Sequence, residues 1–197
     1  MTRVPCAAGR PAARGMLAGM YSPDRYVETM RFAAARHVAQ KEPGHDLPYL
    51  VHVVSVAAEV IAALPLTPLA DPELAVTCAL LHDTVEDTVT TLDELAAKFG
   101  PAVAAGVAAL TKDHTLPKPE QMADSLRRIR EQPPEIAVVK LADRITNLSA
   151  PPHYWTKEKC TAYRAEAVTI ADALGHASAA LAARLRARID AYAAYCS

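Results

Sequence analysis

The chain has 197 residues, 51% of them hydrophobic and 22% charged, which is typical of one globular domain. Its formal net charge is −1. A nucleic-acid-binding surface would require an excess of basic residues, which this chain does not have, so no nucleic-acid partner is expected. No apolar run reaches the roughly 18 residues of a membrane-spanning helix, and the four cysteines form no CxxC pair, which favours a cytoplasmic protein with no membrane partner and no disulfide framework. Residues 1–21 contain arginines but no continuous apolar segment, so they are expected to be a disordered extension rather than a signal peptide, followed by one domain over residues 22–197.

Apolar residues recur at helical spacing along this domain, with no convincing strand alternation. Clustered prolines mark the ends of the apolar segments. The first helix is expected from Pro23 to Gln40, because Ser22 is a suitable N-cap and proline is favoured in the first helical turn. Further helices are expected over about 48–64, from 72 through the run ELAVTCALLHD, over 91–100, 101–110, 119–131 and 134–149, and over 156–174 and 177–195. The sequence therefore predicts an all-α fold, with TKDHTLPKPE as a polar loop.

Four ionisable residues gather where the apolar run ALLHDTVED ends. His82 and Asp83 are adjacent, so both can converge on one ion at the helix end, and an imidazole with a carboxylate suits Mn, Fe or Zn. Glu86 and Asp87 each follow one of them by four residues, which in a continuous helix places them on the same faces. The alternative is a solvated helix end with a capping carboxylate.

Two other apolar segments carry single polar residues of the same chemical kind. His52 lies in LPYLVHVVSV, where a buried core histidine is the alternative to a metal ligand. Asp143 follows EIAVVKLA, and a buried carboxylate is costly unless it is paired or metal-bound; an ion pair with Lys140 or Arg144 is the alternative. Asn147 follows Asp143 by four residues, on the same helical face. Together, the ordered histidine, histidine–aspartate and aspartate supply four ligands for one divalent metal ion.

The order H…HD…D resembles the signature of HD-domain phosphohydrolases. The longer strings PYLVH, ALLHDTVEDT, TTLDELAAKFGPAV, TKDHTLPK and KLADRITNL resemble the alarmone hydrolase domain of the SpoT and Rel proteins, in its small stand-alone form of the metazoan SpoT homologue type. The resemblance covers about residues 24–175. It implies an all-α HD-domain helical bundle, a small-molecule nucleotide substrate, and removal of the 3′-pyrophosphate from (p)ppGpp with bound Mn²⁺.

The resemblance also implies roles for particular residues. The implied metal ligands are His52, His82, Asp83 and Asp143. Glu86 and Asp87 would orient and deprotonate the attacking water. Asn147 would contact the nucleotide near the metal, and Lys118 and Tyr163 would hold its phosphates and ribose.

One loop departs from the family pattern. Where the family has Q-x-R-K after the histidine of the first helix, this chain has Gln40, Lys41 and Glu42. Lys41 is expected to bind substrate in part, although lysine lacks the forked donors of arginine. Glu42 is expected near the path of an anionic substrate, where its charge would weaken binding.

Three other functions stay open, and the altered loop favours the first of them. One is an HD-fold enzyme acting on another phosphorylated nucleotide or cofactor, as a nucleotidase, an NADPH phosphatase or a phosphodiesterase. A second is a non-catalytic domain that binds alarmone, against which the intact HDTVED string argues. A third is a dinuclear HD oxygenase, which would need additional histidine ligands. The sequence does not indicate an oligomeric state.

Overall fold

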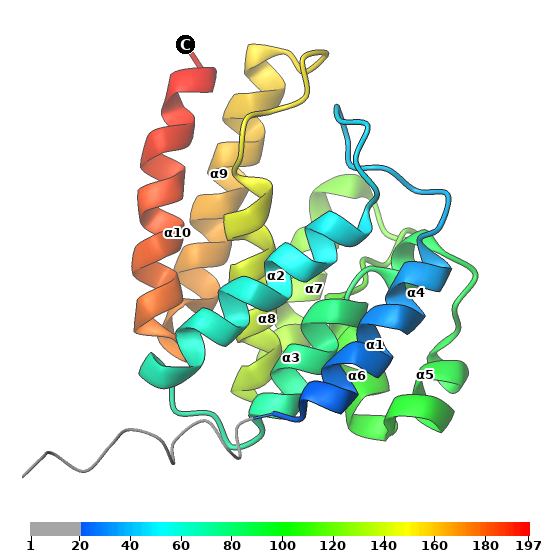
Figure 1. Ribbon diagram of the computed structural model, residues 1–197. Helices are drawn as coiled ribbons and strands as arrows, with labels where there is room; N and C mark the ends of the chain where they lie inside the picture. Colours follow the sequence, from blue (N-terminus) through cyan, green and yellow to red (C-terminus); the bar gives the residue numbers. More distant parts are fainter. Residues whose placement is uncertain (1–20) are drawn as a thin grey trace, which may run out of the picture.

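The computed structural model describes residues 21–197, and within that range it is a bundle of helices with no strand, which confirms the predicted all-α fold (Figure 1). The elements in chain order are α1 (Pro23–Arg36), α2 (Leu50–Ala63), η2 (Leu64–Leu66), α3 (Pro72–Leu81), α4 (Thr84–Asp87), α5 (Leu92–Phe99), α6 (Pro101–Leu110), α7 (Lys118–Arg130), α8 (Pro134–Asn147), α9 (Lys157–Leu174), η3 (Gly175–Ala177), α10 (Ala179–Tyr192) and η4 (Ala193–Tyr195). The extension predicted for residues 1–21 lies, apart from its last residue, outside the described part of the chain. None of the described helices is long and apolar enough to cross a membrane.

The helices begin where the sequence supplies a cap. Ser22 Oγ accepts a hydrogen bond from the backbone N–H of Arg25 at 3.3 Å, and Asp71 Oδ1 accepts one from Leu74 at 2.9 Å. Each cap is followed by a proline within the first helical turn, where its missing N–H is not needed. Thr91 caps α5 by accepting the backbone N–H of Glu94 at 3.2 Å, without a following proline. The predicted starts of these three helices are therefore confirmed.

The first helix ends at Arg36 rather than at the predicted Gln40. His37 Nδ1 lies 2.6 Å from Gln40 Oε1, and the amide nitrogen of Gln40 donates to Asp87 Oδ2 at 2.8 Å. The backbone N–H of Gln40 donates to the carbonyl of His37 at 2.9 Å, which closes a turn in place of the next helical repeat. Contacts with a distant part of the chain thus override the local preference for helix.

Three further boundaries also differ from the prediction. The second helix begins at Leu50 rather than near residue 48. The helix before the HD pair stops at Leu81, and α4 begins only at Thr84, after a turn in which Asp83 has φ −101° and ψ −2°. Residues 82–87 are therefore not one continuous helix. Lys118, predicted in a loop, is the first residue of α7.

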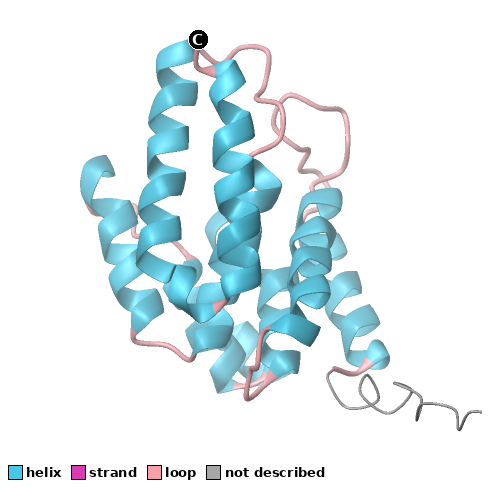
Figure 2. Ribbon diagram, turned by 90° about the vertical axis from the view of Figure 1, so that its left-hand side faces the viewer, coloured by secondary structure: helices cyan, strands magenta, loops and turns pink. Residues whose placement is uncertain are grey.

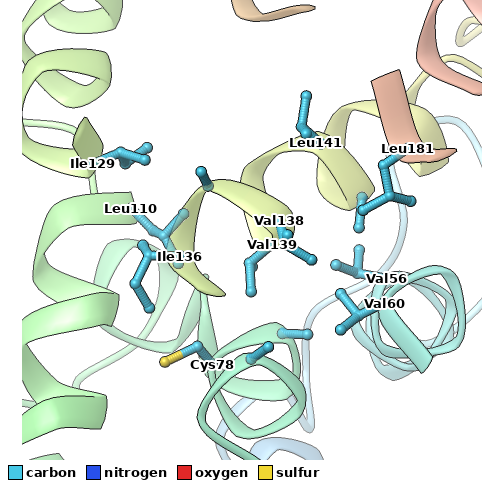
Figure 3. Close-up of a cluster of buried hydrophobic side chains, with 14 of the residues drawn as sticks. Val56, Val60, Cys78, Leu110, Ile129, Ile136, Val138, Val139, Leu141 and Leu181 are labelled. Carbon is cyan, nitrogen blue, oxygen red and sulfur yellow. The ribbon is translucent and has the colours of Figure 1, made fainter. Parts of the chain in front are cut away.

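Helix α8 forms the centre of the bundle, and eleven of its 14 residues are buried. Figure 3 shows Val138 and Val139 of α8 facing Val56 and Val60 of α2, all four with no exposed surface. Burying each aliphatic side chain of this size stabilises the fold by about 1.5–3 kcal/mol. The same packing carries the carboxylate of Asp143, near the end of α8, into the interior.

Two loops meet at the end of the bundle where the chain terminates (Figure 2). The loop over residues 37–49 folds back through an isolated bridge between Lys41 and Pro48. Gly44 in this loop has φ +82°, and a Cβ added to it would lie 2.9 Å from the Cα of Pro152 in the loop after α8. Glycine is required here, because any side chain would be strained and would push the two loops apart.

Candidate active site

Four side chains with metal-binding atoms converge from α2, the end of α3 and α8. His52 Nε2 is 3.3 Å from His82 Nε2. Asp83 Oδ2 is 2.9 Å from His82 Nε2 and 3.6 Å from His52 Nε2. Asp143 Oδ1 is 3.6 Å and 3.8 Å from the same two nitrogen atoms. The ligand atoms of His52, His82 and Asp83 all lie within 4.8 Å of one another, so these three side chains could hold one ion. Asp143, the fourth predicted ligand, lies beside both imidazoles but is not part of this closest group.

The donor set fits a divalent transition-metal ion. His82 Nδ1 lies 2.8 Å from the carbonyl oxygen of Ala79; a proton on Nδ1 satisfies this contact and leaves Nε2 free to bind a metal. Two carboxylates and two imidazoles form the mixed oxygen and nitrogen set that suits Mn, Fe or Zn. His52, His82 and Asp143 are only 5%, 3% and 6% exposed. Carboxylates at this depth need a cation beside them.

The charges of the site shift the pKa values of its own members. Burial alone would lower the pKa of His82, but the charge and hydrogen bond of Asp83 and the charge of Asp143 raise it to about 9. Burial raises the pKa of Asp83, whereas the neighbouring histidines hold it well below its usual range. Asp143 is likewise buried, and Lys140 and His82 lower its pKa to about 2. Both carboxylates therefore stay ionised, and without a metal ion an imidazole takes up a proton to balance them.

Three side chains hold the carboxylates of Asp83 and Asp143 in place. The hydroxyl of Tyr49 donates to Asp83 Oδ2 at 2.5 Å, and the amide of Asn147 donates to Asp143 Oδ1 at 2.5 Å. Lys140 Nζ donates to Asp143 Oδ2 at 2.9 Å. Tyr49 was not singled out from the sequence, although it lies in the PYLVH string. The ion pair with Lys140, considered from the sequence as an alternative to metal binding, coexists with the ligand geometry.

Glu86 faces the loop between α6 and α7. Its Oε2 accepts the backbone N–H of Lys112 at 3.0 Å. Its Oε1 is 3.8 Å from Lys112 Nζ and 3.7 Å from His114 Nε2. The stacking of Glu86 over His82 expected from a continuous helix does not apply, because the helix is interrupted between the two residues.

Asp87, which follows Glu86 in the sequence, raises the pKa of Tyr49 through its negative charge. Burial raises the pKa of Tyr49, and the charges of Asp83, Asp87 and Asp143 raise it further. Tyr49 therefore remains protonated and can only donate to Asp83. Because Asp87 accepts the amide of Gln40 at 2.8 Å, it also ties the turn after α1 to the site.

A cavity of about 230 Å³ opens beside the ligands. His52 and Tyr49 lie at its metal-binding end. Its other lining residues come from the two loops that meet through Gly44 and Pro152 and from α8, α9 and α10: Glu42, Pro43, His45, Thr146, Asn147, Ser149, Ala150, Pro151, Pro152, Trp155, Tyr163 and Tyr192. The predicted substrate residues Asn147 and Tyr163 are therefore both in its wall.

The two predicted substrate lysines are not among the lining residues. The ammonium of Lys41 forms an ion pair with Asp46 in its own loop. Lys118 is exposed at the start of α7. The sequence pattern could not indicate where these two lysine side chains point, because their direction depends on how the loops pack.

The aromatic wall of the cavity is supported by a buried arginine. The guanidinium of Arg144 lies 4.2 Å from the ring centroid of Tyr163 and forms an ion pair with Glu166. Arg144 therefore does not pair with Asp143, which was one alternative from the sequence. Trp155 also lines the cavity, with its ring centroid 5.1 Å from that of Tyr163.

A helical bundle that gathers a histidine, a histidine–aspartate pair and an aspartate around one point defines the HD-domain class. The family model described as HD domain matches residues 29–185, and the chain belongs to this family. Within it, the chain belongs with the MESH1 proteins. It is 33% identical over 165 residues to the guanosine-3′,5′-bis(diphosphate) 3′-pyrophosphohydrolase MESH1 of Danio rerio, covering 81% of this chain and 89% of that protein. The corresponding human protein is 34% identical over 142 residues, covering 70% and 77%.

A solved structure of similar fold also supports membership of this family. It is described as a metazoan ortholog of SpoT that hydrolyzes ppGpp and plays a role in starvation responses. Its TM-score is 0.75 at 27% sequence identity, and the match covers 93% of this chain and 97% of the other. The similarity therefore includes the whole bundle and not only the segments that carry the ligands.

Proposed function

We propose that this protein is a (p)ppGpp 3′-pyrophosphohydrolase that uses Mn²⁺ and acts in the cytoplasm. The observation that carries the proposal is the convergence of the four ligands beside a cavity with aromatic walls. The activity printed for the MESH1 relatives supports the choice of substrate. The free thiols of Cys78, Cys160 and Cys196 suit a reducing compartment.

The residues of the site supply positioning and charge, on which phosphoryl transfer chiefly depends. A divalent metal ion held by these residues would polarise a phosphoryl oxygen and lower the pKa of bound water. Asp83 and Asp143 would balance the charge of that ion, and Tyr49 and Asn147 hold the two carboxylates in one orientation. Lys140 limits the excess negative charge that Asp143 brings into the interior.

Glu86 takes the proton of the attacking water. One of its oxygen atoms is held by the backbone N–H of Lys112 at 3.0 Å, and the other is available as a proton acceptor. Asp87, linked to Gln40, orients the water. The pyrophosphate group of the substrate lies at the metal-binding end, and the nucleoside extends along the cavity past Tyr163 and Trp155.

The test is a substrate panel with purified protein loaded with Mn²⁺, Fe²⁺ or Zn²⁺. The panel contains ppGpp, pppGpp, NADPH and nucleoside monophosphates, and released pyrophosphate and phosphate are measured separately. We expect pyrophosphate from ppGpp and pppGpp, fastest with Mn²⁺. Hydrolysis of NADPH or a monophosphate without hydrolysis of either alarmone would contradict the proposed substrate.

The metal site is tested with two variants of its ligands. His82→Ala and Asp83→Ala should each lose bound metal and activity together, because each variant lacks one of the few atoms that would coordinate the ion. Asp190→Ala is the control, since its side chain on α10 is 83% exposed. Stoichiometric metal in both ligand variants, measured by elemental analysis after dialysis, would refute the site.

A further inference from the structure

Glu42 is the only acidic or basic side chain, histidines apart, among the residues that line the cavity. No cationic group within residues 21–197 lies at ion-pair distance from its carboxylate, and the neighbouring Lys41 is paired with Asp46 instead. A carboxylate repels phosphate. The phosphates of a nucleotide are therefore expected at the metal-binding end, and an uncharged part of the nucleotide is expected beside Glu42.

The walls around Glu42 suit a nucleobase. Trp155 and Tyr163 offer aromatic faces, and Pro43, Pro151 and Pro152 offer apolar surface. Proteins hold single bases by stacking them on aromatic side chains and by hydrogen bonding to their Watson–Crick edges. The cavity has the stacking surface, and Glu42 is the one carboxylate among its lining residues.

The backbone of the loop holds Glu42 in this position. Its N–H donates to the carbonyl of Leu47 at 3.0 Å, and its own carbonyl accepts the N–H of His45 at 3.1 Å. The contact between Gly44 and Pro152 joins the loop to the opposite wall. A loop whose backbone is held in this way loses less conformational freedom when a ligand binds against it.

We infer that Glu42 is a specificity residue that reads the Watson–Crick edge of guanine. Guanine presents the N1–H and the N2 amino group side by side, and these two donors match the two oxygen atoms of a carboxylate. Hypoxanthine retains only the N1–H, and adenine presents no adjacent pair of donors. The identity of the full substrate rests on the proposed function, whereas the preference for guanine is a property of the cavity alone. This role differs from simple repulsion of an anionic substrate, which would act equally on all nucleotides.

Binding without hydrolysis tests the inference. The chain has one tryptophan, Trp155, and it lines the cavity, so its fluorescence reports occupancy. Metal-loaded protein is titrated with GDP, IDP and ADP. For the wild-type protein we expect IDP and ADP to bind at least about tenfold more weakly than GDP, the scale of a hydrogen bond to a charged group.

Two variants of the same loop separate base reading from charge. Glu42→Gln should reduce the ratio of GDP to IDP affinity to about threefold or less, and Glu42→Ala should bring it close to one. Asp46→Asn removes the same charge from the same loop, but Asp46 does not line the cavity; it should keep the wild-type ratio. Bound metal is measured in every variant and should not change.

Other results would overturn the inference. These are equal binding of GDP and IDP by the wild-type protein, an unchanged ratio in Glu42→Ala, or an equal gain in affinity for all three nucleotides in Glu42→Gln. The proposed function fails separately, if ppGpp is not hydrolysed by a protein that still binds GDP in a Glu42-dependent way. Conversely, hydrolysis of ppGpp without base discrimination would refute only the role of Glu42.

Discussion

The hydroxyl of Tyr49 donates a hydrogen bond to Asp83 Oδ2 with 2.5 Å between the two oxygen atoms. This contact joins the start of α2 to the turn after α3, across 34 positions of sequence. Asp83 lies in that turn and not within a helix, so helical geometry alone does not orient its carboxylate. Tyr49 supplies the missing constraint, and its ring also packs against His52, with 5.1 Å between the ring centroids.

Replacing Tyr49 with phenylalanine removes the hydroxyl and keeps the ring packing. We expect Tyr49→Phe to fold normally and to bind metal about 10–100-fold more weakly, the usual effect of losing a residue that orients a ligand. Affinity is measured by competition with a chromophoric chelator. Tyr154→Phe is the control, because Tyr154 is 60% exposed. An affinity equal to that of the wild-type protein would show that the turn orients Asp83 without help.

Glu86→Gln tests the proposed general base. Glutamine can still accept the hydrogen bond from Lys112 N–H but cannot take a proton from water. We expect the variant to keep stoichiometric metal and to lose about 10²–10⁴-fold in kcat, with little change in KM. Glu120→Gln, at an exposed position in the first turn of α7, should behave like the wild type. Wild-type kcat in a metal-replete Glu86→Gln protein would reject the role.

Metal binding should release a proton from His82. In the metal-free protein Asp83 and Asp143 outweigh the effect of burial and raise the pKa of His82 to about 9, whereas a metal ligand must be neutral. Metal affinity should therefore rise by about tenfold per pH unit up to about pH 9. Calorimetry at pH 7 in two buffers of different ionisation enthalpy measures the released proton. The same heat in both buffers would contradict a protonated His82.

The raised pKa of His82 also predicts how the stability of the metal-free protein varies with pH. The folded-state pKa of about 9 lies above the ordinary value of 6.5, so the stabilising contribution of the protonated imidazole is complete below about pH 6.5. It is lost as the pH rises towards 9. Thermal melts of metal-free protein should shift to lower temperature over this interval, and those of metal-loaded protein should shift less. Parallel shifts in the two forms would argue against His82 as the titrating group.

Gly106 tests the packing between α6 and its neighbours. A Cβ at this position would lie 2.5 Å from Ile136 Cδ1 and 2.9 Å from Cys78 Sγ. Alanine improves helix propensity by about 1 kcal/mol, but overpacking of a buried site costs about 1–3 kcal/mol. We therefore expect Gly106→Ala to lower the free energy of unfolding by about 1 kcal/mol, measured by urea denaturation. In an Ile136→Val background, which lacks the clashing Cδ1, the loss should shrink; an equal loss in both backgrounds would place the strain elsewhere.

Local sequence was enough to predict the helical class and most helix starts, and to single out the four polar residues that lie near one another in the fold. Caps and first-turn prolines act on backbone groups within about four residues. Ser22 and Thr91 therefore marked real helix starts. His52 and Asp143 stood out because a polar residue in an apolar helix needs a partner, and that requirement is visible without knowing the partner.

Tertiary structure decided which groups meet and where the helices stop. The end of α1 depends on the contacts of Gln40 with His37 and Asp87, and Asp87 lies 47 positions away along the chain. The same packing turned Lys41 towards Asp46 and left Glu42 in the cavity wall, although the two residues are adjacent in sequence. Neighbouring residues determine helical periodicity and capping, whereas distant elements that pack around a loop determine the direction of its side chains. For that reason only the folded bundle could place Glu42 and Trp155 in the wall of one cavity.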